Sequence, residues 1–300
     1  MRIGLIGLGR MGGNIATRLV TDGHSIVTFD QDISAVSASI ENGSDGVSSI
    51  HELVMSVDRP RVIWVMLPAG DITEGVIHDL IPLLSHGDIL VDGGNCHYLD
   101  SIRRANNARA NGIEYIDVGI SGGIKGLTRG YSVMVGGSVE AFNMVEPIFR
   151  SLAAQGTGYG HVGPIGSGHY AKMIHNGIEY GLMQAYAEGF ELLFSKKEFD
   201  IDLSKLSGIW QSGSVISSTL LDFINEVLGE NSTLDNIVGY IEDTGGGRWT
   251  VVESIEMNVP TPVITAALQQ RFRSRRDYSY GDRLQAALRH AFGGHAIVTK

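Results

Sequence analysis

Gly7-Leu8-Gly9-Arg10-Met11-Gly12 is the stretch that decides the fold, because it follows the strand-like run Ile3–Ile6 and opens the helix-length segment Met11–Asp22. In such a turn the first glycine allows a tight bend and the second lets a pyrophosphate approach the backbone. The third permits close packing of helix on strand. The helix N-terminus offers N–H groups and a partial positive charge to an anion. We therefore expect all six residues to bind a dinucleotide.

A carboxylate follows the second strand-like run, Ser25–Phe29. Asp30 stands where the adenosine ribose of a dinucleotide should arrive. It would accept a hydrogen bond from a 2′-hydroxyl and repel a 2′-phosphate, and no Arg follows it to hold that phosphate. The alternative is that Asp30 is only a solvated strand end. The pattern predicts NAD as the cofactor, in preference to NADP.

Strand-like and helix-length segments alternate in the first half of the chain. The apolar runs are Ile3–Ile6, Ser25–Phe29, Val62–Leu67, Ile89–Val91, Glu114–Val118 and Ser132–Val135. The segments between them include Met11–Asp22, Thr73–Leu84, Leu99–Asn111 and Val139–Ala153. This alternation predicts parallel βαβ units with right-handed crossovers, and hence a doubly wound, Rossmann-type α/β sheet.

The pattern becomes helical in the second half. Gly166–Phe194 contains neither a strand-like run nor a proline, and the remainder is helix-like apart from loops at Thr244–Gly247 and Pro260–Pro262. We predict an NAD-binding Rossmann-type domain over residues 1–163 and an all-helical domain over residues 164–300.

Composition narrows the class of protein. With 300 residues, 43% hydrophobic and 19% charged, the chain is typical of a globular protein of two domains. The formal charge of −10 argues against a nucleic-acid partner. The single cysteine, Cys96, fits a reducing compartment, and we expect it to be a small buried hydrophobe. Val62–Leu67 is too short to cross a bilayer, and Met1 leads straight into a strand without a signal peptide. These features predict a cytoplasmic protein with no membrane partner.

Three further strand ends carry unusual loops, and ligands of open α/β sheets bind beyond such ends. The first is Val65–Gly70, the second Asp92-Gly93-Gly94-Asn95, and the third Asp117–Gly123. The third offers a hydroxyl and two successive N–H groups that suit a carboxylate, although an isolated Ser-Gly-Gly is commonly an ordinary turn. The candidates are Met66, Leu67, Pro68 and Asn95 for the cofactor, and Asn95, Ser121, Gly122 and Gly123 for the substrate.

A polar stripe lies on the long predicted helix, at Lys172-Met173-Ile174-His175-Asn176-Gly177-Ile178-Glu179-Tyr180. It places an amine, an imidazole, an amide and a carboxylate at i, i+3, i+4 and i+7, within an arc of about 100°. The neighbouring positions are apolar, so the helix is otherwise suited to burial. Because burying an unpaired charge is unfavourable, the stripe is either a solvated face or a site.

Together these motifs resemble the 6-phosphogluconate dehydrogenases, a branch of the β-hydroxyacid dehydrogenase family. The resemblance rests on Gly7–Gly12, Asp92–Asn95, Asp117–Tyr131 and Lys172–Tyr180, and it continues to Arg289–His295. The wider family shares the Ser-Gly-Gly loop and the helix lysine. The continuation to Tyr180 and the terminal Arg-x-x-Phe-Gly-x-His pattern belong to the phosphogluconate branch. At 300 residues the chain resembles the short form, which lacks a duplicated helical half.

The resemblance implies oxidative decarboxylation of 6-phospho-D-gluconate to D-ribulose 5-phosphate and CO2 with reduction of NAD, in the pentose phosphate pathway or gluconate utilisation. It makes Lys172 the group that takes the C3 hydroxyl proton and then stabilises the enolate, and Glu179 the group that protonates the enediol. Ser121, Gly122 and Gly123 would hold the substrate carboxylate, and Asn95, His175 and Asn176 its hydroxyls. Since the lysine replaces a Lewis acid, we expect no metal, and no His pair beside carboxylates suggests a ligand set.

The phosphate end of the substrate is implied by family position to contact Tyr180, Arg271, Arg289 and His295. In the longer enzymes the last Arg and His come from a neighbouring subunit, which implies a homodimer or homotetramer, although a short tail could instead reach its own site. One loop departs from the pattern. The longer enzymes carry Lys-Gly-Thr-Gly-Lys-Trp, whereas this chain has Thr244-Gly245-Gly246-Gly247-Arg248-Trp249. The first Lys and the Thr, which contact phosphate, are missing.

Two alternatives stay open at this point. One is a β-hydroxyacid dehydrogenase for another small acid, such as 3-hydroxyisobutyrate or unphosphorylated gluconate. The other is a non-catalytic NAD-binding sensor, against which the presence of both Lys172 and Glu179 argues.

Overall fold

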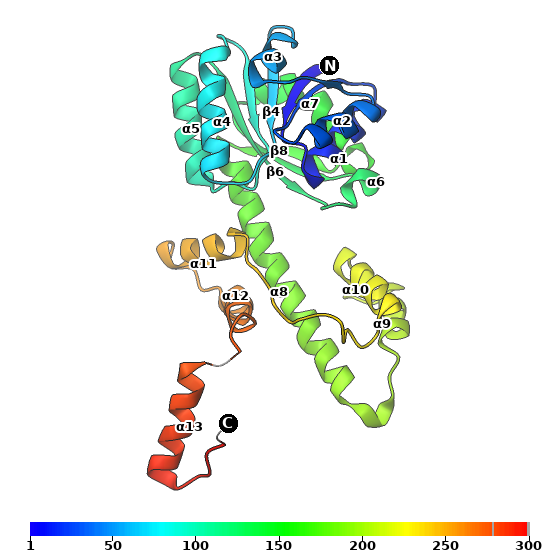
Figure 1. The fold of residues 1–300 in the computed structure, drawn as a ribbon, viewed down its shortest axis with the longest axis vertical. Helices are drawn as coiled ribbons and strands as arrows, with labels where there is room; N and C mark the ends of the chain where they lie inside the picture. Colours follow the sequence, from blue (N-terminus) through cyan, green and yellow to red (C-terminus); the bar gives the residue numbers. More distant parts are fainter. Residues whose placement is uncertain (278, 299–300) are drawn as a thin grey trace. The chain divides into compact units, whose positions relative to one another are not determined.

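The computed structural model describes residues 1–277 and 279–298, with Phe292 described by its backbone alone. The chain forms two compact units, Met1–His175 and Asn176–Lys300 (Figure 1). They meet inside one long helix, α8 (Ser167–Ser195). The two compact units are not the domains predicted from the sequence, whose boundary at residue 163 stays a prediction.

The first unit is built on one eight-stranded sheet in the order β3-β2-β1-β4-β5-β6-β7-β8. The strands are β1 (Arg2–Ile6), β2 (Ser25–Phe29), β3 (Asp45–Gly46), β4 (Val62–Val65), β5 (Ile89–Asp92), β6 (Glu114–Ser121), β7 (Ser132–Gly136) and β8 (Tyr159–Gly163). The chain runs outward from β1 to β3 and then returns to β4 on the other side of β1. The direction of winding therefore reverses between β1 and β4, and ligands bind at such reversals.

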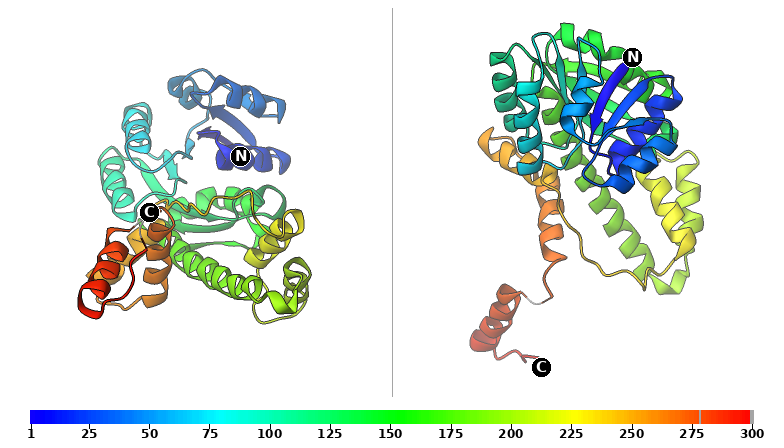
Figure 2. Two further views of the ribbon diagram at one scale, coloured as in Figure 1. Left: turned by 60° about the horizontal axis from the view of Figure 1, so that its bottom comes forward. Right: turned by 45° about the horizontal axis from the view of Figure 1, so that its top comes forward.

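Helices cover both faces of this sheet, as the two views of Figure 2 show. They are α1 (Arg10–Thr21), α2 (Ile33–Glu41), α3 (Ile50–Met55), α4 (Asp71–Leu80), α5 (Tyr98–Ala110), α6 (Gly126–Arg129) and α7 (Val139–Leu152). One apolar core joins α1 and α7 to the sheet through Ile15 and Phe149, and a second joins α3, α4 and α5 through Leu53 and Ile77. A sheet covered on both faces needs apolar central strands, and β4 is completely buried. The predicted doubly wound α/β fold is confirmed.

Three details of the sheet differ from the prediction. β6 and β7 pair antiparallel, with Val118 opposite Val135, because only the ten residues 122–131 connect them. A parallel crossover needs a dozen or more residues. The short edge strands β3 and β8 were not predicted, since Asp45–Gly46 has two residues and Tyr159–Gly163 carries two glycines in place of an apolar run. β4 ends at Val65, so Met66 and Leu67 already belong to the loop.

The second unit is all-helical, as predicted. Beyond α8 it contains α9 (Leu203–Gln211), α10 (Thr219–Glu230), α11 (Gly246–Glu256), α12 (Pro262–Arg273) and α13 (Tyr280–Gly293). Three short 3₁₀ turns complete the chain, namely η1 (Ile81–Leu83), η2 (Ala154–Gly156) and η3 (Lys197–Phe199). The loop predicted at Thr244–Gly247 is wrong in its second half, because α11 begins at Gly246. Among the residues that the structure describes, no helix combines the length and apolar character needed to span a bilayer.

Candidate functional site

The glycine turn between β1 and α1 has the geometry that a dinucleotide requires. Gly7 has a φ of 97°, and a Cβ on it would lie 2.4 Å from the carbonyl oxygen of Met66, so the loops after β1 and β4 touch. A Cβ on Gly12 would lie 1.9 Å from the Gly7 oxygen. No side chain caps the N-terminus of α1 at Gly9. The N–H groups of the first turn, at Arg10 and Met11, are therefore available to an anion.

Asp30 is tied to the same turn. One carboxylate oxygen accepts the Leu8 N–H at 2.6 Å, and the other accepts the Asp32 N–H at 2.9 Å. The side chain is half-buried, so it is more than a solvated strand end. Each oxygen keeps a lone pair for a further donor. The structure thus places Asp30 beside the residues predicted to bind the dinucleotide.

Gly9 permits a test of the turn that leaves the fold intact. It has ordinary dihedral angles (φ −58°, ψ −176°), and nothing lies within 4 Å of an added Cβ. We expect Gly9→Ala to keep the wild-type Tm but to weaken NAD binding at least about tenfold, or about 1.4 kcal/mol, because the methyl group occupies the approach of the pyrophosphate. The measurement is NAD titration by calorimetry.

Gly13→Ala is the matched control for that substitution. Its added Cβ would meet only the Leu8 carbonyl oxygen, at an ordinary 3.4 Å, one turn further into α1. NAD affinity should stay at the wild-type value. Wild-type affinity in Gly9→Ala would contradict the assignment of the turn.

The loop after β5 carries Asn95, which is half-buried. A Cβ on Gly93 would lie 2.1 Å from Trp64 Nε1, and one on Gly94 would lie 2.8 Å from the Leu67 carbonyl oxygen. The loop thus packs against β4 and against the loop that holds the candidate cofactor residues Met66–Pro68. On that side, the Thr73 hydroxyl donates to the Pro68 carbonyl at 2.7 Å.

Two substrate candidates far apart in the sequence meet at the end of β6. The Ser121 hydroxyl lies 3.1 Å from His175 Nε2 on α8. Lys172 approaches the same strand, since a Cβ on Gly119 would lie 2.5 Å from the Lys172 Cβ. Gly122 and Gly123, which follow Ser121, are exposed and have φ angles of 135° and 56°. An amine, a hydroxyl, an imidazole and a glycine turn are therefore gathered in the first unit.

A buried carboxylate that the sequence analysis did not single out holds the start of α8. Asp117 accepts the N–H groups of Gly166 at 2.6 Å and His169 at 2.7 Å. The His169 ring in turn lies 2.7 Å from the Ser101 hydroxyl of α5. Burial raises the pKa of Asp117, and the His169 ring opposes that effect. This cluster fixes the helix turn that precedes Lys172.

In the second unit, Asn176 and Tyr180 are buried against the loop that departs from the long-form pattern. A Cβ on Gly246 would lie 2.6 Å from Asn176 Nδ2, and one on Gly247 would lie 2.4 Å from the Tyr180 ring. The Thr244 N–H donates to the Tyr180 hydroxyl at 3.4 Å. Glycines at both positions thus let the first turn of α11 lie directly on α8.

Arg271 lies over this aromatic ring, and two other arginines pair with Asp243. The Arg271 guanidinium lies 3.5 Å from the centroid of the Tyr180 ring and donates to the Glu242 carbonyl at 2.7 Å. Asp243 pairs with Arg248 at 3.0 Å and Arg275 at 2.9 Å, and the Arg248 guanidinium lowers the pKa of that carboxyl. Family position implied that Arg271 contacts the substrate phosphate, which stays a prediction, and the Asp243 pairs were not predicted.

Arg289 and His295 are not brought to that position. Arg289 lies on α13. His295 follows this helix, and its backbone carbonyl oxygen lies 2.8 Å from Nδ1 of His290. Within 1–277 and 279–298 the structure records no hydrogen bond from either residue to Tyr180 or Arg271. Their predicted part in phosphate binding stays a prediction. In the same described ranges, no three His, Cys, Asp or Glu side chains form a group that could hold a metal ion.

The fold and this arrangement define a class of protein. A doubly wound sheet with a glycine turn at the β1/β4 reversal, followed by a helical unit, is the architecture of nicotinamide-dinucleotide oxidoreductases with a Rossmann-type domain.

Residues 2–163 match the family described as the NAD binding domain of 6-phosphogluconate dehydrogenase, and residues 168–295 match the 6-phosphogluconate dehydrogenase C-terminal domain. The chain belongs to the 6-phosphogluconate dehydrogenase family.

Individual relatives agree with this. Bacillus subtilis YqeC is 43% identical over the whole of both chains. The NAD(+)-dependent, decarboxylating 6-phosphogluconate dehydrogenase of Haloferax volcanii is 42% identical over 301 residues, covering 100% of this chain and 99% of its own. The solved Plasmodium falciparum 6-phosphogluconate dehydrogenase has a TM-score of 0.85 at 29% identity, and the match covers 100% of this chain and 66% of that one.

Proposed function

We propose that this protein oxidises and decarboxylates 6-phospho-D-gluconate to D-ribulose 5-phosphate and CO2, with NAD as the electron acceptor. The observation that best supports this is the approach of Lys172 to Gly119, two residues before the Ser121 hydroxyl that contacts His175. An amine near a hydroxyl and an imidazole supports the proposal that Lys172 acts as a base on a hydroxy acid.

NAD, held at the glycine turn Gly7–Gly12, would supply the acceptor for the hydride that leaves C3 of the substrate. Neutral Lys172 takes the proton of the C3 hydroxyl, so that a ketone forms as the hydride leaves. A lysine is an effective base only when burial or nearby cations favour its neutral form, and Lys172 is half-buried. Ser121, Gly122 and Gly123 orient the C1 carboxylate, while Asn95 and His175 bind substrate hydroxyls.

In the second step the bond between C1 and C2 breaks and CO2 leaves. The electron pair of that bond forms the double bond between C2 and C3, and the π electrons of the ketone move onto its oxygen, where protonated Lys172 stabilises the resulting negative charge. Glu179 then delivers a proton to C2 of the enediol, and the ketose results. Asn176 binds the substrate, and Tyr180 and Arg271 contact its phosphate.

NAD is the proposed acceptor because Asp30 presents its carboxylate beside the glycine turn, where it would repel a 2′-phosphate. The Haloferax volcanii relative is NAD(+)-dependent by name, whereas the Plasmodium falciparum enzyme has been solved in complex with NADP+. The residues of the glycine turn fit either dinucleotide, so the proposed preference for NAD over NADP rests on Asp30. We also propose a cytoplasmic homodimer or homotetramer that works without a metal.

One assay tests the reaction and the cofactor together. Formation of reduced nicotinamide is followed with 6-phosphogluconate, gluconate and 3-hydroxyisobutyrate, each with NAD and with NADP. We expect kcat/KM to be highest for 6-phosphogluconate with NAD, and full activity in excess EDTA. Preference for hydroxyisobutyrate would replace the proposed substrate, preference for NADP would refute the role of Asp30, and no turnover with any acid would favour a sensor.

A further inference from the structure

A buried ion pair lies directly behind the loop that carries Asn95. Asp92, the last residue of β5, has a completely buried side chain, and that of Arg104 on α5 is 2% exposed. Arg104 Nη1 donates to Asp92 Oδ2 at 3.1 Å. The Tyr115 hydroxyl donates to the same oxygen at 2.7 Å. Because a buried pair loses its hydration, its contribution to the free energy of folding is small or unfavourable, and stability alone is a weak reason for it.

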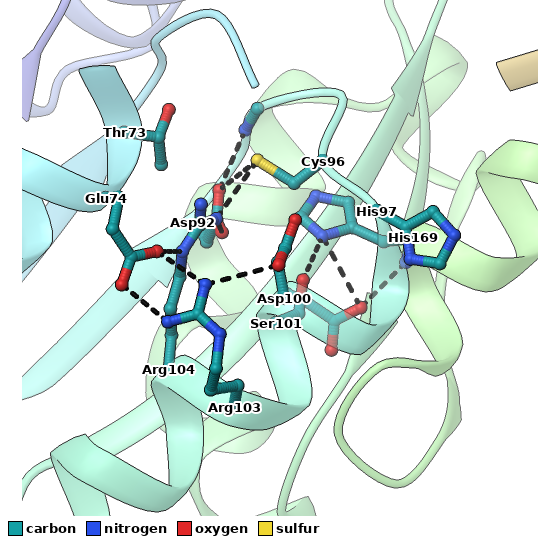
Figure 3. Close-up of polar contacts among 12 residues, drawn as sticks. Thr73, Glu74, Asp92, Cys96, His97, Asp100, Ser101, Arg103, Arg104 and His169 are labelled. Atoms are coloured by element: carbon teal, nitrogen blue, oxygen red, sulfur yellow. Dashed lines mark hydrogen bonds and ion pairs between the residues drawn. The ribbon is translucent and has the colours of Figure 1, made fainter. Parts of the chain in front are cut away.

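The pair holds the loop on both sides of Asn95. Asp92 Oδ1 accepts the Gly94 N–H at 3.2 Å and contacts the Cys96 thiol at 3.6 Å. Arg104 Nη1 also donates to Cys96 Sγ at 3.3 Å. Figure 3 shows Arg104 and Cys96 on either side of Asp92. Both neighbours of Asn95 are therefore held by the ion pair: Gly94 by Asp92, and Cys96 by Asp92 and Arg104.

Arg104 is itself held in place from outside the loop. Its Nε donates to Glu74 Oε2 on α4 at 2.8 Å, so one guanidinium joins α4, α5 and the Asn95 loop (Figure 3). Arg103 also binds Glu74, and together the two arginines lower the pKa of Glu74 to about 2. The carboxylate therefore stays charged at neutral pH. A planar guanidinium can make these contacts at once, whereas a lysine amine cannot.

Cys96 is changed by this environment. The expectation that Cys96 is small and buried is confirmed, and its thiol also contacts Asp92 and Arg104. Burial, and then the negative charge of Asp92, raise its pKa to about 12. The thiol is therefore neutral near neutral pH. Because Cys96 is only 3% exposed, its rate of reaction with a reagent in solution measures how firmly the loop covers it.

We propose that Arg104 is a positioning residue for the reaction: through Asp92 and Cys96 it fixes the loop that presents Asn95 to the substrate. This rests on the proposed function, in which Asn95 binds a substrate hydroxyl. Arg104 touches no reacting atom. Its loss should misplace Asn95 by an amount on the order of 1 Å, which lowers turnover about 10²-fold.

Two substitutions separate positioning from stability. Arg104→Met removes both the charge and the contacts. Arg104→Lys keeps a positive charge for Asp92 but cannot reach Glu74, Asp92 and Cys96 together. We expect Arg104→Lys to regain most of the Tm lost in Arg104→Met, while its kcat stays about 10²-fold below wild type. NAD affinity, which depends on the glycine turn, should stay at the wild-type value in both.

Arg103→Met is the matched control. Arg103 is the adjacent arginine of α5 and binds the same Glu74 at 2.6 and 2.8 Å. Its other recorded hydrogen bond in the described part of the chain goes to Asp100. Its kcat should equal that of wild type. Alkylation of Cys96, the chain's single cysteine, supplies a second readout that does not depend on substrate. Because Arg104 itself lowers the pKa of the thiol, faster alkylation without Arg104 reports a more exposed Cys96 and not a more acidic one. Alkylation should be at least about tenfold faster in both Arg104 variants and unchanged in Arg103→Met.

These readouts distinguish this inference from the proposed function. Wild-type protein that fails to turn over 6-phosphogluconate refutes the proposed function, and the alkylation rates then still test the hold on the loop. Wild-type kcat in Arg104→Lys, or wild-type alkylation rates in both Arg104 variants, overturns the role given to Arg104. Equal losses of kcat in Arg103→Met and Arg104→Met also overturn it, because the effect would then belong to Glu74.

Discussion

Lys172→Met is expected to abolish turnover of 6-phosphogluconate while leaving NAD binding intact. Methionine has a similar length but can neither accept the C3 hydroxyl proton nor stabilise the enolate charge. Loss of a general base lowers the rate by about 10²–10⁴-fold, and loss of the electrostatic contribution adds to it. The measurements are kcat with NAD and NAD affinity by calorimetry, which reports separately on the turn at Gly7–Gly12.

Lys205→Met is the control for general effects of removing a lysine, because Lys205 is an exposed residue of α9 in the second unit. It should retain wild-type kcat. Retained activity in Lys172→Met would remove the base from the proposed mechanism. Loss of NAD binding together with activity would instead show that the substitution disturbs the cofactor turn.

Glu179→Gln is expected to separate the two halves of the reaction. Glutamine keeps the shape of the side chain but has no carboxyl proton to give to C2 of the enediol. Hydride transfer should therefore proceed, and the steady-state rate should fall by about 10²–10⁴-fold because the enediol is protonated slowly. Rapid mixing with NAD should show a fast first turnover of reduced nicotinamide followed by a slow phase.

Glu188→Gln on the same helix is the control, since Glu188 is exposed and accepts a hydrogen bond only from Gln184, at 2.8 Å, among the contacts that the structure gives it. It should show no change in either phase. If Glu179→Gln slows the first turnover as much as the steady state, the residue acts before or during hydride transfer and the assigned role is wrong.

Features of the fold that depend on local pattern could be predicted from sequence. The run Gly7–Gly12 between an apolar strand and a helix is one such pattern, and the structure confirms both elements around it. The uninterrupted stretch Gly166–Phe194 is another, and it forms α8. The antiparallel pairing of β6 and β7 was missed because strand-like runs carry no direction, and direction depends on the length of the connection.

The supporting contacts of the candidate site could not be predicted in this way. Asp117 lies 49 residues before Gly166, and Ser121 lies 54 residues before His175. No periodicity links positions so far apart, since only the folded sheet brings them together. Arg104 and Glu74 read as ordinary charged positions on amphipathic helices, although they meet beside Asp92. The sequence thus indicated which functional groups the loops carry, whereas the residues that hold these loops in place could be identified only from the structure.

The central claim is oxidative decarboxylation of a phosphorylated aldonic acid, and its stoichiometry tests that claim most directly. Purified protein is given 6-phosphogluconate labelled at the carboxyl carbon together with NAD, and labelled CO2 is compared with reduced nicotinamide. The mechanism through Lys172 and Glu179 predicts one CO2 for each NADH and ribulose 5-phosphate as the product. NADH without labelled CO2 would contradict it, because the chain would then oxidise its substrate without breaking the bond between C1 and C2.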